Sequence, residues 1–198
     1  MNTSRGLERL ILFSDAVVAI AITLLILPLV ESVADFEGAD LADYVDEHYL
    51  QLLVFALSFV VIGRFWMVHH RMYEKVAGYT QPMLWVNLLW LMSIVFLPFP
   101  TALLSASSSS SIHALYIGTI LVTSLASLLQ QWLIKRDPTL QIPEARGTIR
   151  MLPFVITPLI LAVALALALA IPSFEVWSVL VLLTVAPIEV LGRRKARA

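Results

Sequence analysis

The sequence predicts an all-α, polytopic membrane protein with six transmembrane helices. Hydrophobic residues make up 60% of the 198 residues and charged residues only 14%, whereas a soluble domain is about half apolar and about a quarter charged. The apolar residues gather in long runs, and every second connection between those runs contains no Lys or Arg. These observations identify lipid as the solvent of the folded chain.

Each apolar run is near the length of about 20 residues that a helix needs to cross the hydrocarbon core. The predicted spans cover residues 10–30, 50–70, 82–104, 112–134, 151–171 and 174–191. Together they use nearly the whole chain, so we expect a single six-helix transmembrane domain over residues 1–198 without a soluble catalytic domain. The sequence contains no cysteine, which excludes disulfides, thiolate metal ligands and cysteine nucleophiles.

The positions of Lys and Arg predict the orientation, because basic segments resist translocation and stay in the cytoplasm. With the N-terminus inside, residues 1–9, the loop 135–150 and the basic tail 192–198 are cytoplasmic, as is the turn after the second span with Arg64, Arg71 and Lys75. The acidic loop 31–49 then lies outside, and both chain ends are cytoplasmic. Within this loop the spacing of Leu41 and Tyr44 predicts a short amphipathic helix.

Several polar residues occur at membrane depth, where they are costly and point to a function or to a structural lock. Ser14 and Asp15 lie in the first span, His69 and His70 at the end of the second, and Asn87 in the third. If consecutive spans run antiparallel, the end of the second span and the start of the third lie at the same membrane depth as the start of the first. All of these residues would then lie at one depth. We favour a hydrogen-bonded lock, with a proton relay or a metal site as the alternative. Adjacent histidines on a helix point about 100° apart, which weakens the metal hypothesis.

A second feature of the first span is an apolar stripe. Ile20, Thr23, Leu24 and Leu27 follow at i, i+3, i+4 and i+7, and Asp15 faces about 140° away from Ile20. Taken alone, such a stripe is typical of lipid-facing or core packing, with the threonine hydroxyl bonded to the preceding turn.

The first span also carries a recognisable motif. Arg9, Phe13, Ser14 and Asp15 fit the pattern Arg-x-x-x-Phe-Ser-Asp, and the chain thereby resembles the transmembrane protein 175 family of potassium channels. The segment 66–71 with its paired histidines and the run 87–104 also resemble that family. The match covers the first half of the chain well and the second half only in its number of helices.

The resemblance implies a homotetramer in which the first helix of each subunit lines a central pore. Ile20 then takes the position of a hydrophobic constriction, Thr23 that of a pore hydroxyl, and Leu24 and Leu27 further pore-facing turns. A packing network would orient this helix through Arg9, Phe13, Ser14, Asp15, His69, His70 and Asn87.

The implied function is a potassium channel subunit in a prokaryotic plasma membrane, with potassium or other monovalent cations as permeant ions. Its partners are other copies of the chain and membrane lipids, without a cofactor, a metal or a nucleic acid. The sequence contains no Thr-Val-Gly-Tyr-Gly filter, so we expect weak rather than strong potassium selectivity.

A proton-coupled secondary transporter is the alternative function, with Asp15 and His69 or His70 as the coupling site. Transporters of this kind usually show internal repeats and broken helices near the midplane, and the sequence suggests neither. A membrane-embedded enzyme ranks third, because no nucleophile–base pair or metal motif occurs at a suitable spacing.

Overall fold

The computed structural model describes residues 4–33, 40–107 and 109–170, and within these ranges the fold is helical. Five segments are long and apolar enough to cross a membrane. They confirm the first five predicted spans. The predicted sixth span 174–191 and the basic tail 192–198 lie outside the described residues.

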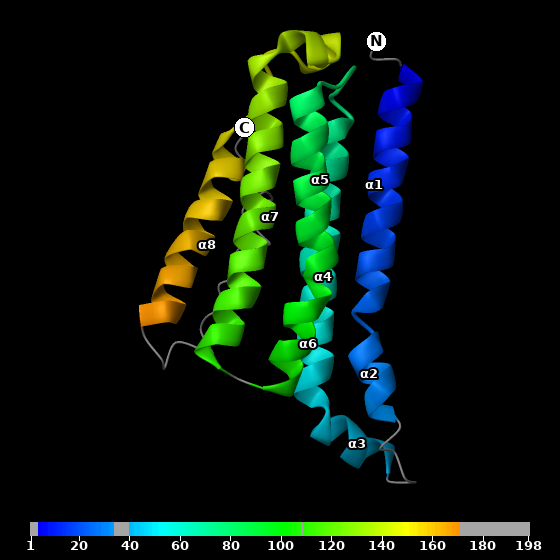
Figure 1. Ribbon diagram of the computed structural model, residues 1–198, viewed down its shortest axis with the longest axis vertical. Helices are drawn as coiled ribbons and strands as arrows, with labels where there is room; N and C mark the ends of the chain where they lie inside the picture. The colour runs from blue at the N-terminus through cyan, green and yellow to red at the C-terminus, as the bar shows by residue number, and fades with distance from the viewer. Residues whose placement is uncertain (1–3, 34–39, 108, 171–198) are drawn as a thin grey trace, which may run out of the picture.

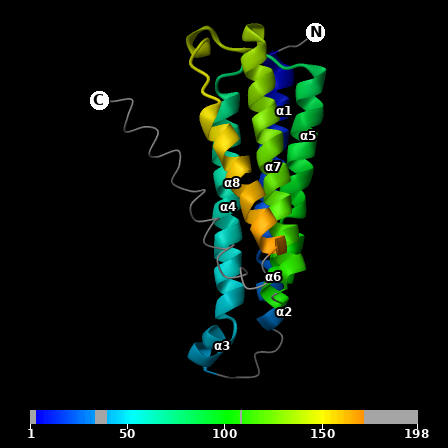
Figure 2. The same cartoon turned by 90° about the vertical axis from the view of Figure 1, so that its left-hand side faces the viewer.

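The helices stand side by side, with α1 at one edge of the bundle and α8 at the other (Figure 1). Helix α7 packs against α5 and α8, and α1 packs against α4 and α5. The view in Figure 2 shows α8 crossing obliquely over its neighbours. The element bounds are α1 Ser4–Leu24, α2 Leu27–Ser32, α3 Leu41–Glu47, α4 Tyr49–Tyr73, α5 Gln81–Phe96, α6 Pro98–Ala106, α7 Ser110–Arg136, η2 Pro138–Leu140, η3 Pro143–Ala145 and α8 Leu152–Ala170.

Two of the membrane spans are interrupted helices, so the expectation of unbroken spans is wrong. The first span divides into α1 and α2, and the third divides at Leu97 into α5 and α6. Proline explains both breaks, because Pro28, Pro98 and Pro100 have no N–H to donate to the preceding turn. The chain continues through Leu97 with hydrogen bonds from Leu97 N to Ile94 O (3.2 Å) and from Thr101 N to Leu97 O (3.1 Å).

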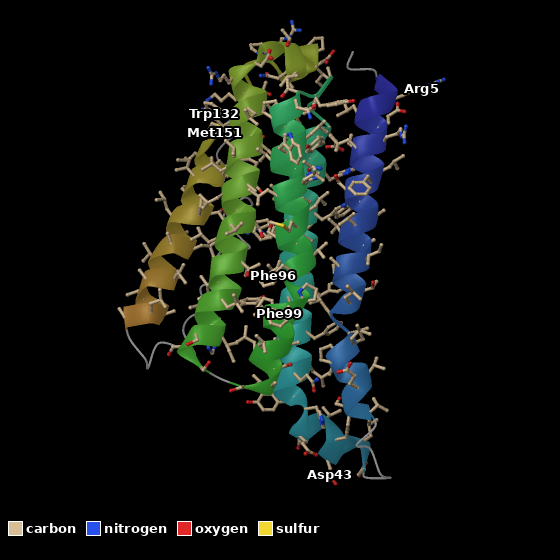
Figure 3. All side chains as sticks on the ribbon, in the orientation of Figure 1. Arg5, Asp43, Phe96, Phe99, Trp132 and Met151 are labelled. Atoms are coloured by element: carbon tan, nitrogen blue, oxygen red, sulfur yellow. The ribbon has the colours of Figure 1, made fainter. Side chains whose placement is uncertain are left out.

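The two ends of the bundle differ in charge. Arg5 and Asp43 lie at opposite ends (Figure 3), and the acidic residues of the predicted amphipathic helix lie on α3, which the structure confirms at Leu41–Glu47. Basic residues end α4 and α7 at the Arg5 end, where Arg71 and Arg136 lie in their last turns.

One basic residue is misplaced by the sequence-based topology. Arg64 does not lie in the turn after the second span, because α4 continues to Tyr73. At about 1.5 Å per residue, its backbone lies roughly 13 Å before the helix end. A long arginine side chain can still direct its charge toward the interface from that depth.

At the Arg5 end, the connection between α4 and α5 is held to the loop after α7. Ala77 N donates to Leu140 O (2.7 Å), and Ile142 N donates to Lys75 O (3.1 Å). The buried Gln141 side chain donates to Ile134 O (2.7 Å), which lies in the last turn of α7. Hydrogen bonds from the Thr139 hydroxyl and backbone N–H lower the pKa of the Asp137 carboxyl at the start of this loop.

Within the bundle, hydroxyl groups join helices that are distant in sequence. Ser58 on α4 contacts the Tyr116 hydroxyl on α7 at 3.0 Å and accepts from Thr101 of α6 at 3.0 Å. Thr123 on α7 donates to Ser93 on α5 at 2.9 Å. These contacts fix the depth of each helix relative to its neighbours, which apolar packing alone does poorly.

The packing of α1 against this core can be tested at Ala21, which is fully buried. Ala21→Leu adds volume where α1 meets the core, and overpacking of this kind costs about 1–3 kcal/mol. We expect a lower midpoint of thermal unfolding, measured by circular dichroism in detergent. Ala56→Leu on the exposed side of α4 is the control, and equal midpoints for the two variants would contradict the packing.

Candidate functional site

The apolar stripe of the first span is exposed at the surface of its own chain. Ile20 is 61% exposed, Leu24 38% and Leu27 48%. Thr23 is also exposed, and its hydroxyl donates to Ile20 O at 2.8 Å. The stripe is therefore available to lipid, to another subunit or to an aqueous path.

The opposite face of α1 is buried. Val18, Ala21 and Leu25 are at most 4% exposed and belong to the main hydrophobic core with residues of α4 and α5. This helix thus has one anchored face and one free face, and the stripe occupies the free one.

The break between α1 and α2 lies inside the stripe. Leu24 is the last residue of α1 and Leu27 the first of α2. Pro28 cannot donate to the carbonyl of Leu24, which loses its usual helical partner. The interruption leaves Leu27 exposed, so the stripe continues across the break.

A chain of buried hydrogen bonds holds the anchored face of α1. Asn87 Nδ2 donates to Ser14 Oγ at 2.9 Å, and Ser14 Oγ donates to Leu10 O at 2.9 Å. Asn87 Oδ1 lies 2.8 Å from His69 Nε2 and accepts from the Tyr73 hydroxyl at 3.4 Å. Since Asn87 Oδ1 can only accept, we assign the proton to His69 Nε2.

Aromatic rings fix His69 in this position. Its ring stacks on Trp90 with a centroid distance of 4.1 Å and on Tyr73 at 4.4 Å. Ser14, His69 and Asn87 are all at most 3% exposed. The chain therefore joins α1, α4 and α5 through groups that are fully removed from water.

The other predicted network residues lie outside this chain. Asp15 Oδ1 accepts from Trp66 Nε1 at 2.8 Å, a separate contact between α1 and α4. His70 lies 3.6 Å from the exposed Glu74 and stacks on Trp66 at 5.4 Å. Arg9 and Phe13 are exposed.

Sequence reasoning missed Trp66, Tyr73 and Trp90 as partners. Trp66, His69 and Tyr73 follow at intervals of three and four, which places them on one side of α4. That spacing could have pointed to an aromatic face, but Trp66, His70 and Tyr73 share the same intervals, so it could not have distinguished His69 from His70.

The geometry offers no support for a metal site among the residues that the structure describes. No group of three His, Asp or Glu residues in these ranges is placed to hold an ion. The buried chain instead consists of neutral donors and acceptors that satisfy one another, an arrangement suited to fixing a helix.

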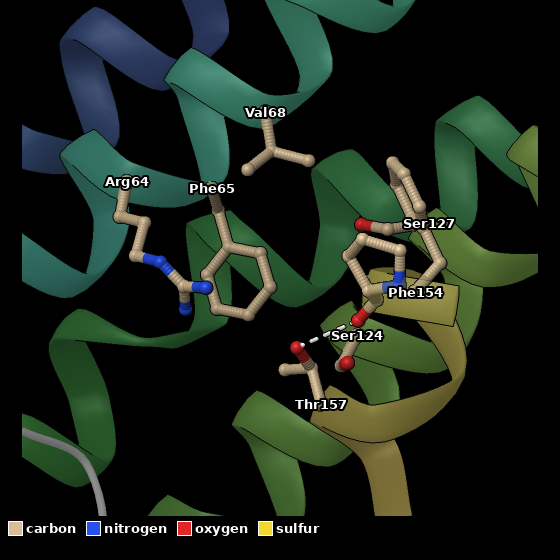
Figure 4. A pocket seen from close by; sticks show the side chains of 8 residues that line it. Arg64, Phe65, Val68, Ser124, Ser127, Phe154 and Thr157 are labelled. Carbon is tan, nitrogen blue, oxygen red and sulfur yellow. Dashed lines mark hydrogen bonds between the residues drawn. The ribbon is translucent and has the colours of Figure 1, made fainter. Parts of the chain in front are cut away.

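A small cavity lies between α4, α7 and α8, with a volume of about 30 Å³. Figure 4 shows Arg64 beside Phe65, with the hydroxyls of Ser124, Ser127 and Thr157 further along the cavity. Thr157 already donates to Pro153 O at 3.1 Å. This volume accommodates about two water molecules, too little for a larger ligand.

Comparison with known proteins relates most of the chain to ion channels. A family model described as "Endosomal/lysosomal potassium channel TMEM175" matches residues 9–98. A Streptomyces collinus protein named a potassium channel is 34% identical over 158 residues, which cover 75% of each chain. A chicken protein named "Endosomal/lysosomal proton channel TMEM175" is 36% identical over 134 residues, 62% of this chain and 26% of the chicken chain.

A solved structure extends the similarity to the fold. It is described as a crystal structure of a lysosomal potassium-selective channel TMEM175 homologue from Chamaesiphon minutus. The TM-score is 0.74 at 27% identity, and the match covers 92% of this chain and 97% of the other.

The buried chain leads to a prediction about Asn87. Asn87→Leu keeps the side-chain volume but leaves the partner atoms of Ser14 and His69 buried without Asn87, which costs about 1–3 kcal/mol. We expect a lower thermal midpoint in detergent. His70→Ala, outside the chain, should change stability by less than about 0.5 kcal/mol. A similar loss in both variants would show that the chain has no special role.

Proposed function

Because the chain belongs to the TMEM175 family of potassium channels, we propose that it is one subunit of a homotetrameric, weakly potassium-selective channel whose pore is lined by α1. The family consists of ion channels rather than enzymes, and the apolar spans make this chain a multi-pass membrane protein. The observation that carries the pore assignment is the exposed stripe on α1, opposite the anchored face.

Physical reasoning supports several symmetry-related copies of the chain around one axis. A single bundle has no way to surround an aqueous path with one helix, whereas symmetry-related copies of α1 enclose such a path with the same face of each. Rings of Ile20 and Leu27 form a hydrophobic constriction that gates by dewetting, and ions pass when the rings widen enough to keep them hydrated.

The charge distribution supports the same arrangement. On the proposed topology the basic end is cytoplasmic and the acidic α3 lies outside, with the sixth span returning the C-terminus to the cytoplasm. Asp43, Asp46 and Glu47 near the outer entrance raise the local concentration of cations. The role of potassium as permeant ion follows from the family, and no cofactor is needed for passage through such a pore.

The pore assignment predicts the effect of polar substitutions on the stripe. Ile20→Asn or Leu27→Asn makes the constriction easier to hydrate, so we expect single-channel conductance to rise about twofold or more, or the potassium over sodium preference to change. Currents in planar bilayers with mixed potassium and sodium measure both quantities.

Ile26→Asn is the matched control, because Ile26 is exposed and lies in the turn between α1 and α2, outside the i, i+3, i+4, i+7 spacing of the stripe. Unchanged currents in both stripe variants would remove the pore assignment.

Saturable, pH-coupled flux without unitary steps would indicate the alternative, a proton-coupled transporter, instead of a channel. Reversal potentials in a pH gradient would show whether protons also permeate, as the name of the chicken relative suggests for that protein.

The tetramer makes its own prediction. Native mass spectrometry of the purified protein should give a complex of four chains of 22.0 kDa each. One chain contributes one copy of α1, so the proposed pore lined by four copies requires four chains. A monomer or dimer that still produces unitary currents would contradict the proposed arrangement.

A further inference from the structure

A groove outside the stripe and outside the buried hydrogen-bond chain lies between α1 and α4. Its volume is about 370 Å³, within the range of about 300–1,000 Å³ that is usual for small-molecule sites. The residues that line it are Asp15, Val18, Ala19, Ile22, Gly63 and Trp66.

Gly63 contributes to the wall of the groove without a side chain. A Cβ atom built at Gly63 would meet no heavy atom within 4 Å, so the space beside this glycine is open. A glycine in the middle of a helix costs about 1 kcal/mol relative to alanine. The opposite wall also carries a small residue, Ala19, and the two together leave room for a ligand.

One polar group is placed in this otherwise apolar groove. Asp15 Oδ1 accepts from Trp66 Nε1 at 2.8 Å, which fixes the carboxylate at one end of the space. Among the described residues, the second carboxylate oxygen has no hydrogen-bond or ion-pair partner. It remains able to accept a hydrogen bond from a ligand.

These features indicate the chemistry of the ligand. A carboxylate attracts a cation and repels a phosphate. A bare metal ion would find a single carboxylate among apolar walls, far fewer oxygen ligands than it requires. Val18, Ala19 and Ile22 instead suit a cation that carries its own hydrocarbon body.

We propose that this groove binds an organic ammonium ion with a compact apolar body, with its charge at Asp15 beside Trp66. The charge complementarity of Asp15 identifies this occupant. Such a ligand lies against Ala19 and Ile22, on the helix that carries the stripe, and so wedges between α1 and α4. This binding does not depend on the conduction pathway proposed above.

The test measures binding directly on the full-length protein in detergent. The probes are 1-aminoadamantane, a cage-shaped primary amine, and 1-adamantanol, its neutral counterpart, and titration calorimetry gives the Kd of each. We expect the amine to bind about tenfold or more tightly than the alcohol. Asp15→Asn keeps an acceptor for Trp66 and removes the charge, so the two probes should then bind equally.

Gly63→Leu places a side chain in the groove, where the added Cβ meets no heavy atom within 4 Å, and Gly118→Leu is the matched control. Gly118 is also a helix glycine with no heavy atom within 4 Å of an added Cβ, but it lies on α7. The amine Kd should rise about tenfold in Gly63→Leu and stay unchanged in Gly118→Leu.

Three results would overturn the proposal. The first is an unchanged amine Kd in Gly63→Leu, and the second is equal binding of amine and alcohol by the unmodified protein. The third is loss of the oligomer on size-exclusion chromatography in Gly63→Leu alone, which would show that a second copy of the chain fills the groove.

Discussion

The hydrogen bonds of Asn87 are the constraint on which the rest of the arrangement depends. In lipid, most helix surfaces are equally apolar, so dispersion and shape fix the rotation of a helix only weakly, whereas an unpaired amide is costly in any wrong rotation. Asn87 reaches Ser14 on α1 and His69 on α4 at the same time. The rotation of α1 is thereby set, and Ile20, six residues beyond Ser14, is directed about 120° away from the anchored face. The free stripe is a consequence of a buried polar contact.

The hydrogen-bond chain around Asn87 consists of uncharged groups, and this explains why it acts as a packing lock. Asn87, Ser14 and Tyr73 carry no charge, and His69 can donate its Nε2 proton to Asn87 while neutral. The ionisable Asp15 stands apart, bonded to Trp66 at the edge of the same helix pair. A proton relay would need Asp15 and His69 to be joined by hydrogen bonds, and the structure separates them. The division between a neutral lock and a lone carboxylate therefore favours packing for the former and leaves the latter able to meet a cationic ligand.

Hydropathy was sufficient to place five spans and α3, because apolar length and amphipathic spacing are properties of the local sequence. It did not reveal the breaks at Leu25–Ile26 and Leu97, since prolines remove hydrogen bonds without lowering hydropathy. The choice between His69 and His70 required the rotation of α4, which neighbouring helices determine. Trp66 and Asp15 are 51 positions apart, so their pairing is a product of helix packing. The sequence analysis named Ser14, His69 and Asn87, which the buried chain joins, but it missed the contacts of Tyr73 and Trp90 with this chain.

The break in the first span changes the chemistry of the proposed pore. A ring of hydrocarbon at Ile20 or Leu27 offers an ion nothing in exchange for its lost water. Here the Leu24 carbonyl lacks its usual donor, because residue 28 is proline. The Thr23 hydroxyl donates its proton to Ile20 O, so its oxygen lone pairs face outward. If α1 lines the pore, these oxygens lie just beyond the Ile20 ring. An ion that passes the ring would meet polar groups within about one helical turn, which shortens the stretch over which it must cross apolar surface and lowers the barrier accordingly.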